Sequence, residues 1–220
     1  MSASISDAET PVSDLGLAWS ADAGNFTGGG PSVTWTAPHD YATPTSLTLT
    51  LTVTERYNTT NSLGVPVTRE NVVTKTRAVR LHNSAREVGD LALDFLAAFS
   101  KQLNPDYVLR NLTSDCDGTA RERDDVIRQQ RDHTMIAYTI GAPVVTVGFT
   151  GRCPFLSAFG DACAQIPATW TSIYKPTGNR GTVVGIDQVT AVLEDDRWWL
   201  CASNWNQTSS TFSTIVRFTR

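Results

Sequence analysis

The order of hydrophobic and polar residues changes character near Ser84. Before this point apolar residues alternate with Ser and Thr, most clearly in residues 46–54, where Leu or Val occupies every odd position. Alternation with a period of two predicts strands that place one face on a core and the other in water. After this point helix-like patterns precede a series of longer strands. The chain is therefore expected to form two domains of different class, residues 1–83 and 84–220.

The first domain is expected to consist of strands only. Its strands are predicted at residues 15–19, 33–35, 46–54 and 71–81, separated by turns that contain glycine. In the last of these strands Lys75 and Arg77 share a face with Val73, which predicts a bulge or only partial burial. Residues 57–68 are expected to form a long polar loop at the tip of the domain.

Residues 17–38 carry the pattern W-x-A-x-x-G-x-F-x-G followed by x-V-x-W-x-A-P, and a strand ending in L-T-V-T comes later. This arrangement resembles bacterial immunoglobulin-like and PKD-type modules. The positions that carry the resemblance are Trp19, Gly24, Phe26, Trp35 and Pro38. It implies an all-β sandwich of about seven strands that serves as a surface spacer or a binding module. Both tryptophans are expected to belong to its core.

The second domain begins with an amphipathic pattern typical of a helix. In residues 87–103 large apolar residues recur at four-residue steps from Leu91 to Leu103, and Pro105 ends the pattern. A short helix is predicted at residues 106–112 and a charged one at 120–133. Strands are predicted at residues 134–149, 162–174, 182–193, 197–203 and 211–218, with a break or bulge at 141–143.

This order of helices and antiparallel strands is typical of an α+β domain. It resembles the NTF2-like, or cystatin-like cone, superfamily. The resemblance rests on the helix with Phe95 and Phe99, the short helix that starts at Asp106, and the hairpin sequence D-D-R-W-W-L at residues 195–200. It implies a curved antiparallel sheet that wraps around a long N-terminal helix and encloses a pocket.

The charge and hydropathy of the chain exclude two classes of partner. A net charge of −4 gives no basic surface for nucleic acid. No apolar run approaches the roughly 18 residues that a transmembrane helix needs. Residues 1–20 lack the pattern of a signal peptide, although Met1-Ser2-Ala3 is equally consistent with an expression start fused to a mature chain.

The four cysteines are Cys116, Cys153, Cys163 and Cys201, and none forms a C-x-x-C pair. Zinc sites usually bring two closely spaced ligand pairs, and such pairs are absent here, so no metal site is expected. No cofactor is expected either. Two disulfides are predicted, and four free buried thiols are the alternative. Of the three possible pairings, Cys153 with Cys163 is favoured because Pro154 and Gly160 suit a hairpin connection, which leaves Cys116 with Cys201. Oxidised cysteines predict a periplasmic or extracellular location.

No catalytic signature occurs in the chain. Asp187 is the only acid well inside a strand pattern, on the same face as Val189 and Ala191, and a buried carboxylate there is a weak candidate for a general base. The alternatives are that Asp187 faces solvent or pairs with an arginine. Residues 122–125 are interpreted as the solvated start of a helix, and His133 as a cap or surface residue.

Five aromatic residues are candidates for the lining of an apolar binding pocket, with ordinary core packing as the alternative. They are Tyr107, Tyr138, Trp170, Trp198 and Trp199. Because strand residues alternate between faces, only one of the last two can face the interior.

The leading hypothesis is a non-enzymatic bacterial protein, secreted or on the cell surface. In it an immunoglobulin-like spacer presents an NTF2-like domain that binds a small apolar ligand or a protein partner. One alternative is an enzyme of the isomerase or dehydratase type with Asp187 as the base. Another is a structural or adhesive fragment of a longer surface protein.

Overall fold

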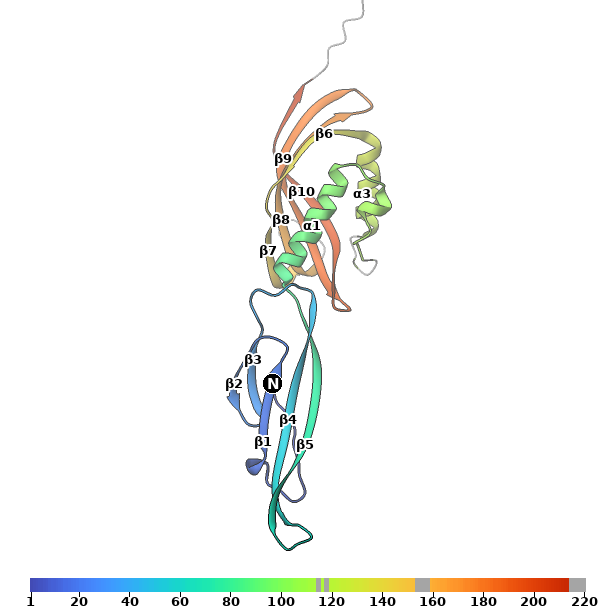
Figure 1. Cartoon of the computed structure of the whole chain (residues 1–220). Coiled ribbons are helices and arrows are strands. Elements are labelled where there is room, and N and C mark those ends of the chain that lie inside the picture. Colours follow the sequence, from blue (N-terminus) through green and yellow to red (C-terminus); the bar gives the residue numbers. More distant parts are fainter. Residues whose placement is uncertain (114–115, 117–118, 153–158, 214–220) are drawn as a thin grey trace, which may run out of the picture. The chain divides into compact units, whose positions relative to one another are not determined.

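The computed structural model describes residues 1–113, 116, 119–152 and 159–213. The chain divides into two units, Met1–His82 and Asn83–Arg220. Figure 1 shows the elements of each unit: strands dominate the first, whereas the second combines helices with long strands. The division falls one residue before the boundary expected from the sequence.

The first unit contains five strands in two antiparallel sheets. The larger sheet has the order β1-β4-β5, and β2 pairs with β3 in the smaller one. The strands are β1 (Gly16–Ala21), β2 (Asn25–Gly29), β3 (Ser32–Thr36), β4 (Thr45–Thr60) and β5 (Pro66–Leu81). Five strands in the described unit are fewer than the sandwich of about seven that the sequence resemblance implied.

The hairpin of β4 and β5 is longer than the sequence predicted. Its pairing runs without interruption from Thr45 opposite Leu81 to Thr60 opposite Pro66. The predicted loop at residues 57–68 is therefore wrong for all but a short turn, in which Asn61 Oδ1 accepts hydrogen bonds from the backbone of Leu63 and Val65. Of the two alternatives predicted for residues 71–81, a bulge or partial burial, the second is confirmed, because β5 pairs without a register shift and leaves most of its side chains exposed.

The alternating pattern in β4 has the expected consequence for burial. Leu47, Leu49 and Leu51 are buried, as is Val33 of β3. Trp19 and Trp35 are only half-buried, and each indole nitrogen donates to a backbone oxygen, that of Gly30 and Ala23 respectively, at 3.0 Å. The rings are thus fixed within the unit.

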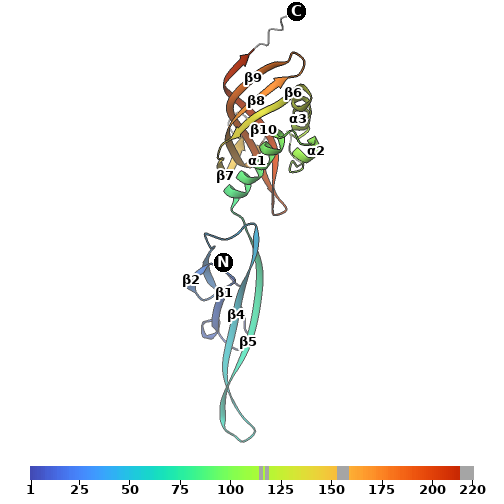
Figure 2. The same cartoon turned by 45° about the horizontal axis from the view of Figure 1, so that its top comes forward.

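The described residues of the second unit form three helices and a five-stranded antiparallel sheet, and the first and third of these helices pack against this sheet (Figure 2). Its strand order is β10-β9-β8-β6, and β7 pairs with another part of β8. The helices are α1 (Ser84–Ser100), α2 (Pro105–Val108) and α3 (Thr119–Asp132). The strands are β6 (His133–Ile140), β7 (Val144–Arg152), β8 (Phe159–Tyr174), β9 (Asn179–Glu194) and β10 (Arg197–Ser213). The predicted break at residues 141–143 is confirmed. The strand predicted at 197–203 and residues 211–213 of the last predicted strand belong to the single strand β10, and residues 214–218 lie outside the described residues.

Helix α1 begins with two reciprocal side-chain caps. The Asn83 side chain accepts from the Arg86 backbone, and the Glu87 side chain accepts from the Asn83 backbone, which satisfies two amides at the start of the helix. The buried face of α1 includes Val88, Ala92, Phe95 and Leu96, in one cluster with Ile166, Val189 and Leu200 of the sheet. This cluster is the core of the second unit.

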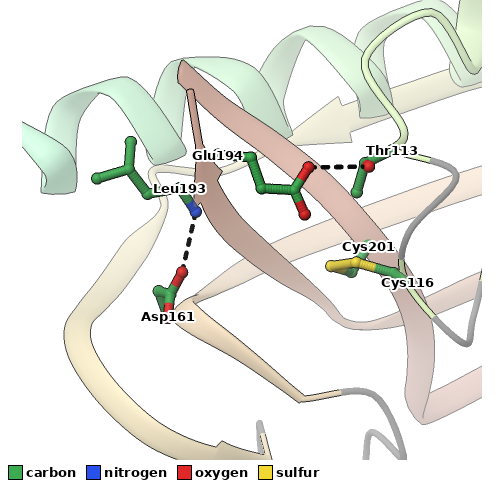
Figure 3. Close-up of a disulfide and its surroundings, with 6 residues drawn as sticks. All are labelled: Thr113, Cys116, Asp161, Leu193, Glu194 and Cys201. Atoms are coloured by element: carbon green, nitrogen blue, oxygen red, sulfur yellow. Dashed lines mark hydrogen bonds between the residues drawn. A yellow bond between two sulfur atoms is a disulfide. The ribbon is translucent and has the colours of Figure 1, made fainter. Parts of the chain in front are cut away.

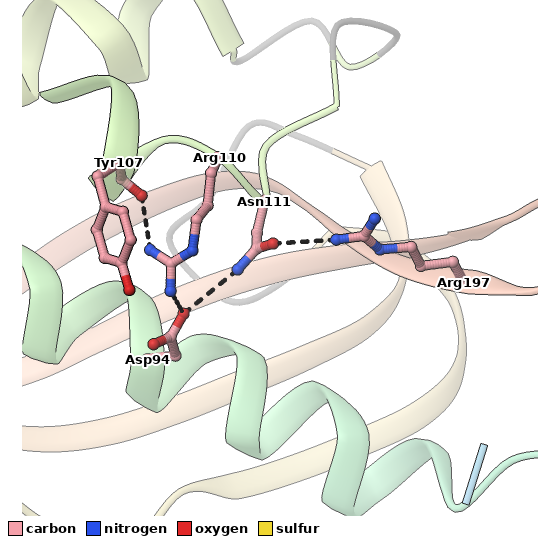
Figure 4. Close-up of polar contacts among 5 residues, drawn as sticks. All are labelled: Asp94, Tyr107, Arg110, Asn111 and Arg197. Carbon is pink, nitrogen blue, oxygen red and sulfur yellow. Dashed lines mark hydrogen bonds and ion pairs between the residues drawn. The ribbon is translucent and has the colours of Figure 1, made fainter.

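A polar network ties α1 to the segment after α2 and to β10 (Figure 4). Asp94 on α1 accepts from the guanidinium of Arg110 and from the side-chain amide of Asn111. The Asn111 oxygen in turn accepts from Arg197 at 3.1 Å. Tyr107 completes the network, because its backbone oxygen accepts from Arg110 and its ring lies 3.7 Å from that guanidinium.

The predicted disulfide between Cys116 and Cys201 is present (Figure 3). The two Cα atoms are 5.2 Å apart, a separation that a disulfide spans readily. Thr113 supports the same junction, because its hydroxyl donates to Glu194 and its backbone amide donates to Leu200. The other predicted pairing involves Cys153, which lies outside the described residues; within them no cysteine is a free thiol.

None of the helices in the described part of the chain combines the length and hydrophobicity needed to cross a bilayer. The described residues also contain no cluster of three or more side chains suited to holding a metal ion.

Candidate functional site

A cavity of about 750 Å³ lies between the helices and the sheet of the second unit. Its wall is formed by residues of α1, α3, β6, β8, β9 and β10. A volume of this size suits a small organic molecule. One part of the wall is aromatic, and another contains two buried carboxyl groups.

Trp170 on β8 forms the aromatic part together with Phe99 and Trp205. Its indole nitrogen donates to the buried Ser100 hydroxyl at 2.8 Å, which fixes the ring orientation. The Phe99 ring meets it edge-on at 6.0 Å, and the Trp205 ring lies 4.2 Å away. Gly185 makes room for Trp205, because a Cβ at this position would lie 2.7 Å from the indole ring.

Glu122 on α3 supplies the first carboxyl. It is only 7% exposed, and its two oxygens accept from the backbone amide and the hydroxyl of Ser203 on β10 at 2.8 and 2.6 Å. Burial raises the pKa of Glu122, and the hydrogen bonds from Ser203 offset part of this shift.

The interpretation of Glu122 as a solvated residue at a helix start is wrong. Glu122 and Val126 are four residues apart on α3, so they share the face that packs inward, and both are buried. The high charge of residues 121–125 concealed this face. Arg121 and Arg128 instead pair with Asp125 at the cavity rim, with nitrogen–oxygen distances of 3.7 and 2.5 Å.

Asp187 on β9 supplies the second carboxyl. It is 3% exposed, and within the described residues its Oδ1 has no hydrogen-bond partner. Burial raises the pKa of Asp187 well above 3.8; the negative charge of Glu122 raises it further, while the Gln188 backbone N–H lowers it. Neither alternative role applies: Asp187 does not face solvent, and it forms no ion pair with any described arginine.

The ionisation state of Glu122 and Asp187 decides which hydrogen bonds they can form. Because each negative charge disfavours the other, the two carboxyl groups resist being ionised together in an empty cavity. A protonated carboxyl donates a hydrogen bond, whereas an ionised one accepts hydrogen bonds or a proton. Asp187 therefore presents a buried polar atom that a ligand in the cavity can satisfy.

Polar side chains also line the cavity at the start of β6. His133, the first residue of β6, lies in the wall with its Nδ1 3.3 Å from the Ser172 hydroxyl and its ring 5.2 Å from that of Tyr174. Gln102 holds this end of the strand, because its side chain donates to the His133 oxygen and accepts from the Met135 amide.

The five aromatic residues singled out in the sequence are not gathered at one place. Trp170 lines the cavity, whereas Trp198 lies in the core, 7% exposed, and Trp199 packs against the Arg197 guanidinium at 4.0 Å. Tyr107 and Tyr138 are exposed and do not belong to the lining.

Trp205 was not among the predicted residues, and a register shift explains why. Trp198 and Leu200 are buried at even positions, but the irregularity between Leu200 and Ala202 changes the parity of the strand. Beyond it Ser203 and Trp205 line the cavity from odd positions. No feature of the sequence marks this bulge.

Comparisons with known proteins give a sparse picture. No protein-family model matches the chain, and no curated protein sequence matches it. Among solved structures, the chain is similar to an "Ntf2 like protein involved in plasmid conjugation" at a TM-score of 0.31 and 10% sequence identity. That alignment covers 89% of this chain and 79% of the other.

Proposed function

We propose that the chain is an exported bacterial binding protein. An immunoglobulin-like spacer, formed by the first unit, presents an NTF2-like domain that holds a small ligand in its cavity without transforming it. The observation that carries this proposal is the cavity of about 750 Å³ with Asp187 Oδ1 buried in its wall and, among the described residues, unpartnered.

Ligand binding would explain why Asp187 has a buried oxygen without a hydrogen-bond partner among the described residues. A buried polar atom that lacks a hydrogen bond destabilises the folded state by about 1–3 kcal/mol. A ligand that supplies the missing donor recovers this free energy as affinity. The aromatic rings of Trp170 and Trp205 offer an apolar surface for the rest of the molecule.

The disulfide supports the proposed export. Cys116 and Cys201 are joined across a sequence separation of 85 residues. Structural disulfides persist mainly in oxidising compartments, such as the periplasm and the extracellular space.

Filling the cavity is expected to abolish binding. Val183 lines the cavity from β9, whereas its neighbour Val184 is 38% exposed and does not belong to the lining. In a titration of the full chain with the neutral fluorophore N-phenyl-1-naphthylamine, we expect saturable binding at one site. Val183→Trp should weaken this binding by about tenfold or more, because the indole occupies the ligand volume.

Val184→Trp is the matched control, since it adds the same side chain on the opposite face of the same strand. It should bind the fluorophore as the wild type does, and both variants should unfold cooperatively. The absence of saturable binding to the wild type, or equal weakening by both substitutions, would contradict the proposal.

One observation favours a second function, that of an isomerase or dehydratase. The raised pKa of Asp187 suits a general base or acid that works close to neutral pH. An enzyme of this kind would lose turnover in Asp187→Asn while still binding the fluorophore, whereas a binding protein shows no turnover to lose.

A further inference from the structure

We propose that the cavity selects organic cations, namely a protonated amine attached to an aromatic or other apolar group. The ammonium group would bind at Asp187 and Glu122, and the apolar part would pack against Trp170 and Trp205. This inference rests on the proposed binding function and specifies the class of ligand.

No lysine or arginine in the described part of the chain is buried beside the two carboxyl groups. Among the described residues of the lining, Arg121 and Arg128 have mostly exposed side chains and pair with Asp125. Of the groups that shift the pKa of Glu122, Arg121 has the smallest influence. Buried acids are normally paired with a cation, so a cationic ligand could take the place of this missing partner.

Both acids can accept further hydrogen bonds. Glu122 accepts from Ser203 through both oxygens and retains further lone pairs, while Asp187 Oδ1 accepts from no described residue. An ammonium group carries three donors and no acceptor. It can therefore donate to Asp187 and Glu122 while its charge offsets their mutual repulsion.

Aromatic rings line the cavity next to Asp187. Trp205 is the cross-strand partner of Asp187 in the pairing of β9 and β10, and its ring lies 4.2 Å from that of Trp170. Aromatic faces attract cations, tryptophan most strongly, and this attraction grows when water is excluded. A carboxyl beside tryptophan rings thus favours a positively charged group over a neutral or negative one.

The test compares three compounds of similar shape that differ in charge: 2-phenylethylamine, 2-phenylethanol and 3-phenylpropanoate. Calorimetric titration of the full chain should give an affinity for the amine about tenfold or more above that for the alcohol, the gain expected of a charge-assisted hydrogen bond. The carboxylate should bind more weakly than the alcohol, because the two acids repel it.

Two substitutions and a control assign this preference to the acids. Asp187→Asn should remove about tenfold of the amine affinity and leave that of the alcohol within about twofold, and Glu122→Gln should reduce the preference in the same direction. Asp196→Asn makes the same acid-to-amide change in the turn between β9 and β10, at a positive φ of 58° that Asn tolerates, and should alter nothing.

Equal affinities for the amine and the alcohol would overturn the inference, as would preferred binding of the carboxylate or no binding of any of the three. Saturable binding of N-phenyl-1-naphthylamine with loss in Val183→Trp would then still support the cavity as a binding site. The two proposals can therefore fail separately.

Discussion

Asp187→Asn is expected to stabilise the second unit at about pH 8 by about 2 kcal/mol or more, while leaving its stability near pH 4 almost unchanged. The reason is the burial of the carboxyl beside Glu122, which raises the pKa of Asp187 in the folded state above 3.8. Below 3.8 the group is protonated in both states and no penalty arises. As the pH rises from 3.8 towards the folded-state pKa, the carboxyl ionises in the unfolded state but stays protonated in the folded state, so the folded state loses stability, and the loss levels off above the folded-state pKa.

The measurement is urea unfolding of the wild type and Asp187→Asn over a pH series. The wild type should lose stability with rising pH more steeply than the variant, since asparagine does not titrate. Glu122, whose pKa is also raised by burial, keeps a smaller slope of the same sign in both proteins. Asp196→Asn should follow the wild-type curve.

A variant that is less stable than the wild type at about pH 8 would show that a partner stabilises the Asp187 carboxylate. This result would contradict the account, in which the buried carboxyl has no such partner. Equal differences at both ends of the series would show that ionisation plays no part. The expected gain in stability with loss of amine binding would mark Asp187 as a residue retained for a ligand.

The disulfide variant Cys116→Ala/Cys201→Ala is expected to lose about 4–5 kcal/mol of unfolding free energy. The bond closes a loop with a sequence separation of 85 residues, and a long loop restricts the unfolded chain strongly. Cys201 is fully buried, so its truncation also removes packing in the junction between β10 and the segment after α2.

Denaturant unfolding of the oxidised wild type and the double variant measures this difference, and substituting both cysteines avoids a lone thiol. The first unit contains no cysteine, so a transition that belongs to residues 1–82 should keep its midpoint and serve as an internal reference. A loss below about 1 kcal/mol would mean that the bond adds little to the fold.

The sequence predicted those elements whose burial follows a simple period. The alternation in β4 is of this kind, and so is the helix expected at residues 87–103, which α1 forms from Ser84 to Ser100. The break at residues 141–143 was predicted from its glycine and proline instead. The end of α1 differs: the helix stops at Ser100, and Gln102 adopts a positive φ of 51°. Its side chain then bridges the backbone of His133 and Met135, a tertiary contact that no local pattern reveals.

The candidate site was predicted only in part. Asp187 and Trp170 stood out in the sequence as an acid and an aromatic within strand patterns, and both line the cavity. Glu122 was hidden in a charged run, and Trp205 lay beyond a bulge that reversed the strand parity. Both residues reach the cavity through the packing of separate elements, which a local pattern of residues does not reveal.

The long hairpin of β4 and β5 could not be predicted from its residues. The polar composition of residues 57–68 predicts a loop, yet most of these residues continue the pairing of the two strands. A strand exposed on both faces carries no hydrophobic alternation, so its pairing is invisible in the pattern of residues.

The most direct test of the binding proposal is the intact mass of the protein isolated from its own host, under native and denaturing conditions. We expect extra mass that is retained natively and lost on denaturation, and a denatured chain about 4 Da lighter than its reduced form, since each of two disulfides removes two hydrogens. A native mass equal to that of the bare chain, together with no change on reduction, would contradict both the ligand and the export.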